Sequence, residues 1–214
     1  MDRRAETSAE TRQRIVEATA ALHSEQGVSA TSLRDIAERA GVSVGTAYHH
    51  FPTYDDAIRA CGHYNHQIHP LPDASIFALA NSVETRIAAF VTAIGAYYER
   101  YPWMELLRSE RSRFAPLDEG LKAFESGLEC LAQRAIGPHR AAPKSGGAAR
   151  SKAVALSTLI AFADIAVFRI LRERGMSLDE ACATVTKVIV ASLPSNTSRR
   201  DPRDGKQSPR RRTS

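Results

Sequence analysis

The segment GVSVGTAYHHFPTYDD, at positions 41–56, concentrates side chains that form hydrogen bonds. Ser43 and Thr46 carry hydroxyls, Tyr48 carries a phenol, and two histidines follow it directly. Neutral groups of this kind can hold a phosphate backbone, and a histidine can donate to a base or accept from one. Gly45 would let the start of a helix approach a phosphate, because free backbone N–H groups point outward there. The side chains of this segment are therefore suited to form hydrogen bonds with a polar surface.

Short helices must position this segment, and the residues before it predict two of them. Apolar residues at helical spacing indicate a helix over residues 8–26, and Gly27 is suited to end it. Thr31 or Ser32 caps the next helix. That helix runs to about residue 40, after which Gly41 can adopt the left-handed conformation.

The segment itself predicts a third helix that starts at Ser43. It can run only to Phe51, because Pro52 disfavours helix in the residue before it. Thr53 then caps a fourth helix, which stops near Pro70. Two helices joined by a tight glycine turn are typical of a helix-turn-helix, although the spacing alone also fits any helical hairpin.

The longer string GVSVGTAYHHFPTYDDAI closely resembles the signature of the tetracycline-repressor (TetR) family. That signature has a valine-serine-x-glycine-threonine turn and helix, followed by tyrosine-x-histidine-phenylalanine and a fourth helix. The resemblance covers roughly residues 9–69. The rest of the chain resembles the family only in helix content and length. An all-α fold of about nine helices is implied, with an N-terminal helix-turn-helix domain and a C-terminal helical domain for ligand binding and dimerisation.

The resemblance also implies three parts of the chain. Residues 9–69 form a DNA-binding domain, with the helix-turn-helix at about 32–51. Residues 74–193 form an effector-binding and dimerisation domain. Residues 194–214 remain as a basic tail, which its arginine, serine and proline content predicts to be disordered.

DNA-contacting residues follow from the resemblance position by position. Tyr48 is expected to meet a phosphate and His49 to face the bases, while Arg34 could bond guanine O6 and N7 in the major groove. Two residues depart from the family pattern: Tyr54 replaces a frequent lysine, and Ala47 replaces the usual leucine or isoleucine. The expected DNA-binding residues are Thr31, Ser32, Arg34, Ser43, Val44, Gly45, Thr46, Tyr48, His49, His50, Thr53 and Tyr54.

Charge alone does not indicate DNA binding. The net charge is +5, and the part of the chain from residue 195 onward holds seven basic and two acidic residues, which accounts for all of it. The remaining residues balance at 22 basic and 22 acidic. With 214 residues and 43% apolar content the chain can still bury a substantial core. The case for DNA binding therefore depends on geometry.

Cysteine content and hydropathy indicate a reducing, cytoplasmic setting. The three cysteines lie far apart without a C-x-x-C pair, which argues against a disulfide framework and a structural zinc cluster. No apolar stretch follows the charged N-terminus, so no signal peptide is expected. Asp164 and Arg169 interrupt the most apolar stretch, residues 153–171, so no membrane association is expected.

Longer apolar helices follow Pro72, one over about 75–101 and one through 117–131. Between them, YPWMELLRSERSRFAP mixes aromatic and charged residues and could line a pocket, although a helix junction with solvated charges is equally compatible. The expected effector is an apolar or aromatic small molecule, with an anionic group as an option. The expected pocket residues are Phe90, Tyr97, Trp103, Met104, Arg108, Arg111, Phe124 and Phe162.

The last part of the chain predicts a homodimer. After a flexible loop at 137–150, residues 153–168 are apolar all round the helix and must be covered on more than one side. In the TetR family the last two helices form a four-helix bundle with a second subunit, which would supply that cover. Asp164 is then either a paired interface charge, which we favour, or a pocket residue. The expected interface residues are Leu159, Ala163, Val167, Val185 and Ile189.

Two alternatives remain beside a regulator. The cluster Cys61, His63, His66 and His69 could hold a metal, although His69 lies six residues after His63 and so on another helix face. An α-helical enzyme is the second alternative, but the chain lacks the common catalytic and phosphate-binding motifs. We therefore expect no metal, no cofactor and no enzymatic activity. The favoured interpretation is a repressor of a palindromic double-stranded DNA operator that a small molecule releases.

Overall fold

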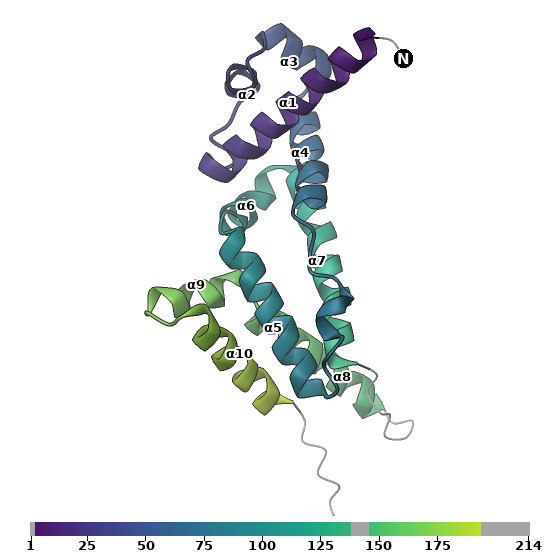
Figure 1. Cartoon of the computed structure of the whole chain (residues 1–214), viewed down its shortest axis with the longest axis vertical. Helices are drawn as coiled ribbons and strands as arrows, with labels where there is room; N and C mark the ends of the chain where they lie inside the picture. The colour runs from purple at the N-terminus through teal and green to yellow at the C-terminus, as the bar shows by residue number, and fades with distance from the viewer. Residues whose placement is uncertain (1–2, 138–145, 194–214) are drawn as a thin grey trace, which may run out of the picture.

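The computed structural model describes residues 3–137 and 146–193, which are mostly helical and contain no strand within these ranges. The α-helices are α1 (Arg3–Gln26), α2 (Leu33–Ala40), α3 (Val44–His50), α4 (Tyr54–Ile68), α5 (Val83–Arg100), α6 (Met104–Glu110), α7 (Ala115–Ile136), α8 (Gly146–Phe162), α9 (Ile165–Glu173) and α10 (Leu178–Ser192). Two 3-10 helices are η1 (Ala74–Phe77) and η2 (Arg111–Arg113). The molecule is elongated, with α1 to α3 at one end and α8 to α10 towards the other (Figure 1). The expected all-α fold is confirmed.

The N-terminal helices enclose a small core of their own. Ile15 of α1, Ile36 of α2 and Phe51 after α3 are almost completely buried there. Removal of such side chains from water is the main force that holds short helices together. This core fixes the position of α3 relative to α1 and α2.

Predicted caps set the boundaries of these helices. Ser32, Ser43 and Thr53 each occupy an N-cap, and each side chain accepts a hydrogen bond from the backbone N–H three residues later. Ser32, and not Thr31, caps α2. Gly41 ends α2 in the left-handed conformation, with φ of 65°, which costs glycine little. The turn between α2 and α3 is therefore the one that the sequence predicts.

The C-terminal body has a larger core, to which α5, α7, α8, α9 and α10 contribute. Phe90 and Ile94 of α5 and Leu159 of α8 have no exposed surface. Helix α4 packs along α7, so it belongs to both bodies (Figure 1). The helix expected over 75–101 is divided: η1 is followed by α5, which Ser82 caps through a capping box with Thr85.

The apolar run 153–168 is two helices, not one. The chain turns at Asp164, whose side chain accepts a hydrogen bond from the backbone N–H of Ala166 and so caps α9. Arg108 of α6 pairs with the same carboxylate, with 2.7 Å between Nη1 and Oδ2. Asp164 is therefore an intrachain cap and ion-pair partner.

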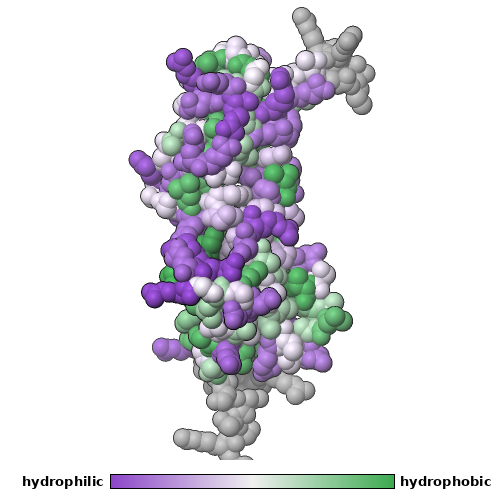
Figure 2. Space-filling view, turned by 60° about the vertical axis from the view of Figure 1, so that its left-hand side comes forward, coloured by the Kyte–Doolittle hydropathy of each residue, from purple (hydrophilic) through white to green (hydrophobic). Residues whose placement is uncertain are grey.

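The residues expected at a dimer interface lie within the subunit. Leu159, Ala163, Val185 and Ile189 are buried in the core of the C-terminal body, and Val167 is half-buried against it. The four buried residues offer no surface to a second copy, because other parts of the same subunit cover them, whereas Val167 keeps some exposed surface. The outward faces of α8 to α10 carry other apolar residues, namely Val154, Phe162, Ile170 and Val188. Figure 2 shows hydrophobic surface more often over the half of the molecule that holds these helices.

Two further expectations concern segments near the ends of the described ranges. The loop expected at 137–150 is shorter, because α8 already begins at Gly146, and residues 138–145 lie outside the described residues. The tail expected at 194–214 also lies outside them.

No single helix in the described ranges is long and apolar enough to span a membrane. Residues 152–162 of α8 and α9 pass by length and composition only when taken together, and a bend of 45° separates them.

Candidate functional site

Helix α3 lies at one end of the molecule (Figure 1). Ala47 is fully buried and anchors one side of the helix against the N-terminal core. Val44, Tyr48 and His49 lie on the opposite, exposed side, with 51% of Tyr48 accessible. The seven-residue helix α3 is therefore anchored by Ala47 and turns a face with hydrogen-bonding side chains towards solvent.

Hydrogen bonds and nearby cations shape this face. Ser43 Oγ accepts from the Thr46 backbone N–H at 3.0 Å, and the two hydroxyl oxygens lie 2.8 Å apart. The pKa of His50 is held below its ordinary value by partial desolvation, and His49 and Arg12 lower it further. The Arg12 guanidinium lies 4.8 Å from the centre of the Phe51 ring. The face therefore offers donors and acceptors with little fixed charge.

A separate cavity lies between α4 and the helices of the C-terminal body. Its volume is about 90 Å³. The lining residues are His23, Ile58, Cys61, Gly62, Asn65, His66, His69, Leu71, Tyr97, Trp103, Met104, Leu107, Pro116, Leu117, Gly120, Leu121 and Phe124. Most are apolar or aromatic, as in typical sites for small organic molecules.

One carboxylate joins the two bodies of the molecule. Glu110, at the end of α6, accepts hydrogen bonds from the backbone N–H groups of Val28 at 2.7 Å and Ser29 at 3.2 Å. Gly27 has φ of +87°, and a Cβ there would lie only 3.0 Å from a Glu110 carboxylate oxygen. Arg113 adds a bond of 2.9 Å to the Ser29 hydroxyl. The turn between α1 and α2 is therefore bound directly to α6, and we call this contact the Glu110 bridge.

A second connection runs from the Glu110 bridge to the cavity. The Tyr54 hydroxyl donates to the Val28 carbonyl at 2.7 Å and lies 2.9 Å from His23 Nε2. Because the Tyr54 hydroxyl already donates its hydrogen bond to the Val28 carbonyl, it can only accept from His23, so His23 carries its hydrogen on Nε2 and donates it. Burial lowers the pKa of His23 to about 4, although Glu110 acts in the opposite direction, so the imidazole is neutral near pH 7. His23 lines the cavity, so a polar chain links the cavity wall to the α1–α2 turn.

Comparisons with known proteins agree on the N-terminal region. Residues 15–61 match the family described as bacterial regulatory proteins, tetR family. The HTH-type transcriptional repressor KstR of Mycolicibacterium smegmatis is 48% identical over 48 residues, which are 22% of this chain and 24% of that protein. The HTH-type transcriptional regulator AcrR of Shigella flexneri is 51% identical over 47 residues, or 22% of each chain.

The N-terminal region of the chain is that of the TetR family. The segments matched in these curated relatives are about a quarter of their length, and the family match runs from the middle of α1 to the middle of α4. None of the names describes an enzyme. A solved structure extends the likeness in fold: a protein from Saccharomonospora viridis in complex with choline is 16% identical, with a TM-score of 0.61, over 86% of this chain and 98% of that one.

Most of the residues expected at DNA lie on the outer side of the TetR-type domain. Arg34, Ser43, Val44, Gly45, Tyr48, His49 and Thr53 are exposed, Thr46 and His50 are partly so, and Ser32 is exposed but bonded to Asp35. Two expectations are corrected. Thr31 is buried and donates to the Gly27 carbonyl. Tyr54 points away from α3 into the contact between the bodies, where it also meets the Phe114 ring edge-on.

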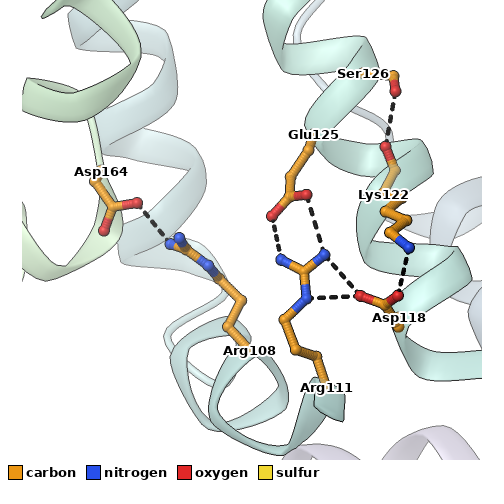
Figure 3. Close-up of polar contacts among 7 residues, drawn as sticks. All are labelled: Arg108, Arg111, Asp118, Lys122, Glu125, Ser126 and Asp164. Atoms are coloured by element: carbon orange, nitrogen blue, oxygen red, sulfur yellow. Dashed lines mark hydrogen bonds and ion pairs between the residues drawn. The ribbon is translucent and has the colours of Figure 1, made fainter. Parts of the chain in front are cut away.

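The expected effector residues divide in the same way. Tyr97, Trp103, Met104 and Phe124 line the cavity. Phe90 is sealed in the core, and Phe162 is 40% exposed on α8, so neither lines it. Figure 3 shows why the two arginines do not: Arg108 pairs with Asp164, while Arg111 pairs with Asp118 and Glu125. Those bonds raise the pKa of Arg111 further above its ordinary value.

No group of three or more metal-binding side chains forms within residues 3–137 and 146–193. Cys61 is buried, and Asn65 Nδ2 contacts its sulfur at 3.3 Å, whereas His63 and His66 are exposed. The metal-sensing alternative therefore has no geometric support in the described part of the chain.

Sequence reasoning missed His23 and Glu110. His23 carried a detectable signal, because a histidine on the apolar side of the first helix must find a partner when buried. Glu110 carried none, because its partners are backbone groups 81 and 82 residues away.

Replacement of Glu110 with glutamine should loosen the Glu110 bridge. An amide offers one acceptor oxygen, and its NH₂ group would face the second backbone donor. The loss of a charge-assisted bond costs about 1–3 kcal/mol, so amide exchange at Val28 and Ser29 should become roughly 5- to 100-fold faster. Hydrogen exchange followed by NMR measures this. Glu119→Gln on α7, whose nearest cation is Arg59 at 3.7 Å, is the matched control, and equal rates in both variants would contradict the role of Glu110.

Proposed function

We propose that the protein is a DNA-binding transcriptional regulator that works as a homodimer on a palindromic operator. In this proposal it is a repressor, and a small molecule in the cavity releases it. The observation that carries the proposal is the exposed face of α3, with Tyr48 and His49 outward and Ala47 buried beneath them. A regulator of this kind acts where bacterial DNA lies, in the cytoplasm.

Two copies are needed because each chain has one α3. A two-fold axis would place two such helices in successive major grooves, about 34–36 Å apart. The outward apolar residues Val154, Phe162 and Val188 are the surface that we assign to the second copy. In this proposal residues 9–69 bind DNA, residues 74–193 bind the effector and the second copy, and α4 is shared.

The cavity is well placed to control the position of the DNA-binding domain. Its wall includes His23 of α1, residues of α4, and Trp103, Met104 and Leu107 next to or within α6. Helix α6 ends at Glu110, which holds the α1–α2 turn. A ligand that binds better when these helices are spread would favour the state whose two α3 helices are wrongly spaced for DNA.

The role of α3 is tested by His49→Ala with Tyr48→Phe as its contrast. His49 is assigned to the bases, so its loss should change preference at one or two base pairs by about 1–3 kcal/mol each. Tyr48 is assigned to a phosphate, so loss of its hydroxyl should weaken all operators by a similar factor. Binding to a library of randomised operators measures both. Equal losses on specific and random DNA for His49→Ala would remove its assignment.

A further inference from the structure

The cavity wall carries no formal charge. Among the described residues, those that line it include no aspartate, glutamate, lysine or arginine. Its polar groups are the imidazoles of His23, His66 and His69, the amide of Asn65, the thiol of Cys61, the phenol of Tyr97 and the indole N–H of Trp103. A charged ligand would therefore find no counter-charge on the wall itself.

The two arginines that the sequence offered as counter-charges are already neutralised. Arg108 Nη1 lies 2.7 Å from Asp164 Oδ2, and Arg111 forms bonds of 2.6 to 3.2 Å with Glu125 and of 2.8 Å with Asp118 (Figure 3). To bind a ligand, either arginine would have to give up a carboxylate that holds it. Neither lines the cavity.

Titratable groups in the wall show that the cavity disfavours both signs of charge. Burial raises the pKa of the Cys61 thiol to about 12, and that of the Tyr97 phenol to about 12, so negative forms are disfavoured. Burial lowers the pKa of His23 to about 4, so the positive form is disfavoured as well. The same loss of hydration would act on an anion or a cation that entered from water.

The remaining features favour rings and one hydrogen bond. Tyr97 and Phe124 lie 5.7 Å apart between ring centroids, and His69 lies 5.7 Å from Trp103. The Tyr97 hydroxyl cannot donate to a ligand, because it already donates to the His69 carbonyl at 3.2 Å. His69 Nδ1 is buried and has no hydrogen-bond partner among the described residues. Buried polar atoms normally have a partner, so a ligand group is a suitable one.

We propose that the cavity selects an uncharged, ring-containing molecule with a hydroxyl or carbonyl group that bonds to His69 Nδ1. The proposal rests on the proposed function only in that the same cavity holds the effector. It replaces the sequence-based option of an anionic group, because the arginines expected to bind that group are paired elsewhere.

Matched probes test the charge preference. Benzyl alcohol, benzoate and benzyltrimethylammonium share one ring, and 2-naphthalenemethanol, 2-naphthoate and (2-naphthylmethyl)trimethylammonium share a larger one. Fluorescence of Trp103, the single tryptophan of the chain, reports binding. In at least one set the alcohol should bind about 10-fold or more tightly than both charged partners. Equal or tighter binding of a charged probe, or binding of none of the six up to millimolar concentration, would overturn the proposal.

Two substitutions test the place and the hydrogen bond. Gly120 lines the cavity, and a Cβ there would meet no atom within 4 Å. Gly120→Glu should therefore shift preference towards the ammonium probe by about 10-fold relative to the neutral Gly120→Gln. His69→Phe keeps a ring but removes the nitrogen, so it should abolish the advantage of 2-naphthalenemethanol over 2-methylnaphthalene. An unchanged preference in either comparison would show that the probe does not bind as proposed.

These measurements need no DNA, so they separate two failures. Selective binding of the alcohol by a protein that does not bind any operator would overturn the proposed function and leave the ligand class intact. Operator binding by a protein that prefers a charged probe would do the reverse.

Discussion

Replacement of Ala163 with arginine should unfold the subunit and not merely separate two copies of it. Ala163 has 1% of its surface exposed and lies in the core where α8 ends. An arginine there would place a long chain in a packed region and a second cation beside Arg108, whose carboxylate partner is already occupied. Overpacking costs about 1–3 kcal/mol, and an unpaired buried charge costs about 3–5 kcal/mol.

The sum approaches the whole stability of a typical domain, about 5–15 kcal/mol. Urea denaturation followed by circular dichroism should therefore show a much lower midpoint or no native baseline. Ala161→Arg is the matched control, because Ala161 is two residues earlier, in the last turn of α8, but exposed. A native-like midpoint for Ala163→Arg would show that position 163 is not in the core.

Phe162→Glu should give the second large effect, on assembly. Phe162 is 40% exposed, next to the buried Ala163, so the subunit should stay folded. A two-fold interface carries each substitution twice, and an aromatic anchor contributes about 2 kcal/mol or more. The dimer should weaken by roughly 4 kcal/mol, or about 1,000-fold. Operator affinity should fall with it, because a monomer has one reading helix.

Sedimentation equilibrium and operator titration measure the two consequences. Ile68→Glu is the control, because Ile68 is 44% exposed and apolar but lies on α4. A Phe162→Glu protein that remains dimeric would place the interface elsewhere.

Local patterns predicted the N-terminal domain well because its boundaries are set by neighbouring residues. Ser32, Ser43 and Thr53 each cap a helix through a hydrogen bond from the backbone N–H three residues later. Gly41 supplies the left-handed turn. The face of α3 follows directly from these caps. Tyr54 escaped prediction because its partner, the Val28 carbonyl, is 26 residues away and depends on how α1 meets α4.

The C-terminal domain was harder to predict because apolar pattern does not say which surface covers a helix. Residues 153–168 are apolar on all sides, so Leu159 and Ala163 were assigned to a second copy when their own subunit covers them. The break at Asp164 was also missed, although Asp164 caps α9 through a local bond from the Ala166 N–H; only its second partner, Arg108, is distant in sequence. The four aromatic and sulfur-containing residues of the cavity were found because they cluster near positions 97–124, whereas His23 comes from a distant helix.

The Glu110 bridge holds the α1–α2 turn mainly by main-chain atoms. Glu110 bonds the N–H groups of Val28 and Ser29, and Tyr54 bonds the Val28 carbonyl, while the buried Val28 side chain packs into the core of the C-terminal body and the Ser29 hydroxyl bonds Arg113. What the contact demands is a residue without Cβ at position 27. The part of this chain from α4 onward should therefore be transferable: grafted behind other α1–α3 helices that have histidine at position 23 and glycine followed by an apolar residue at 27 and 28, it should form the same joint and keep the cavity wall. Such chimaeras would place foreign operators under the control of this cavity.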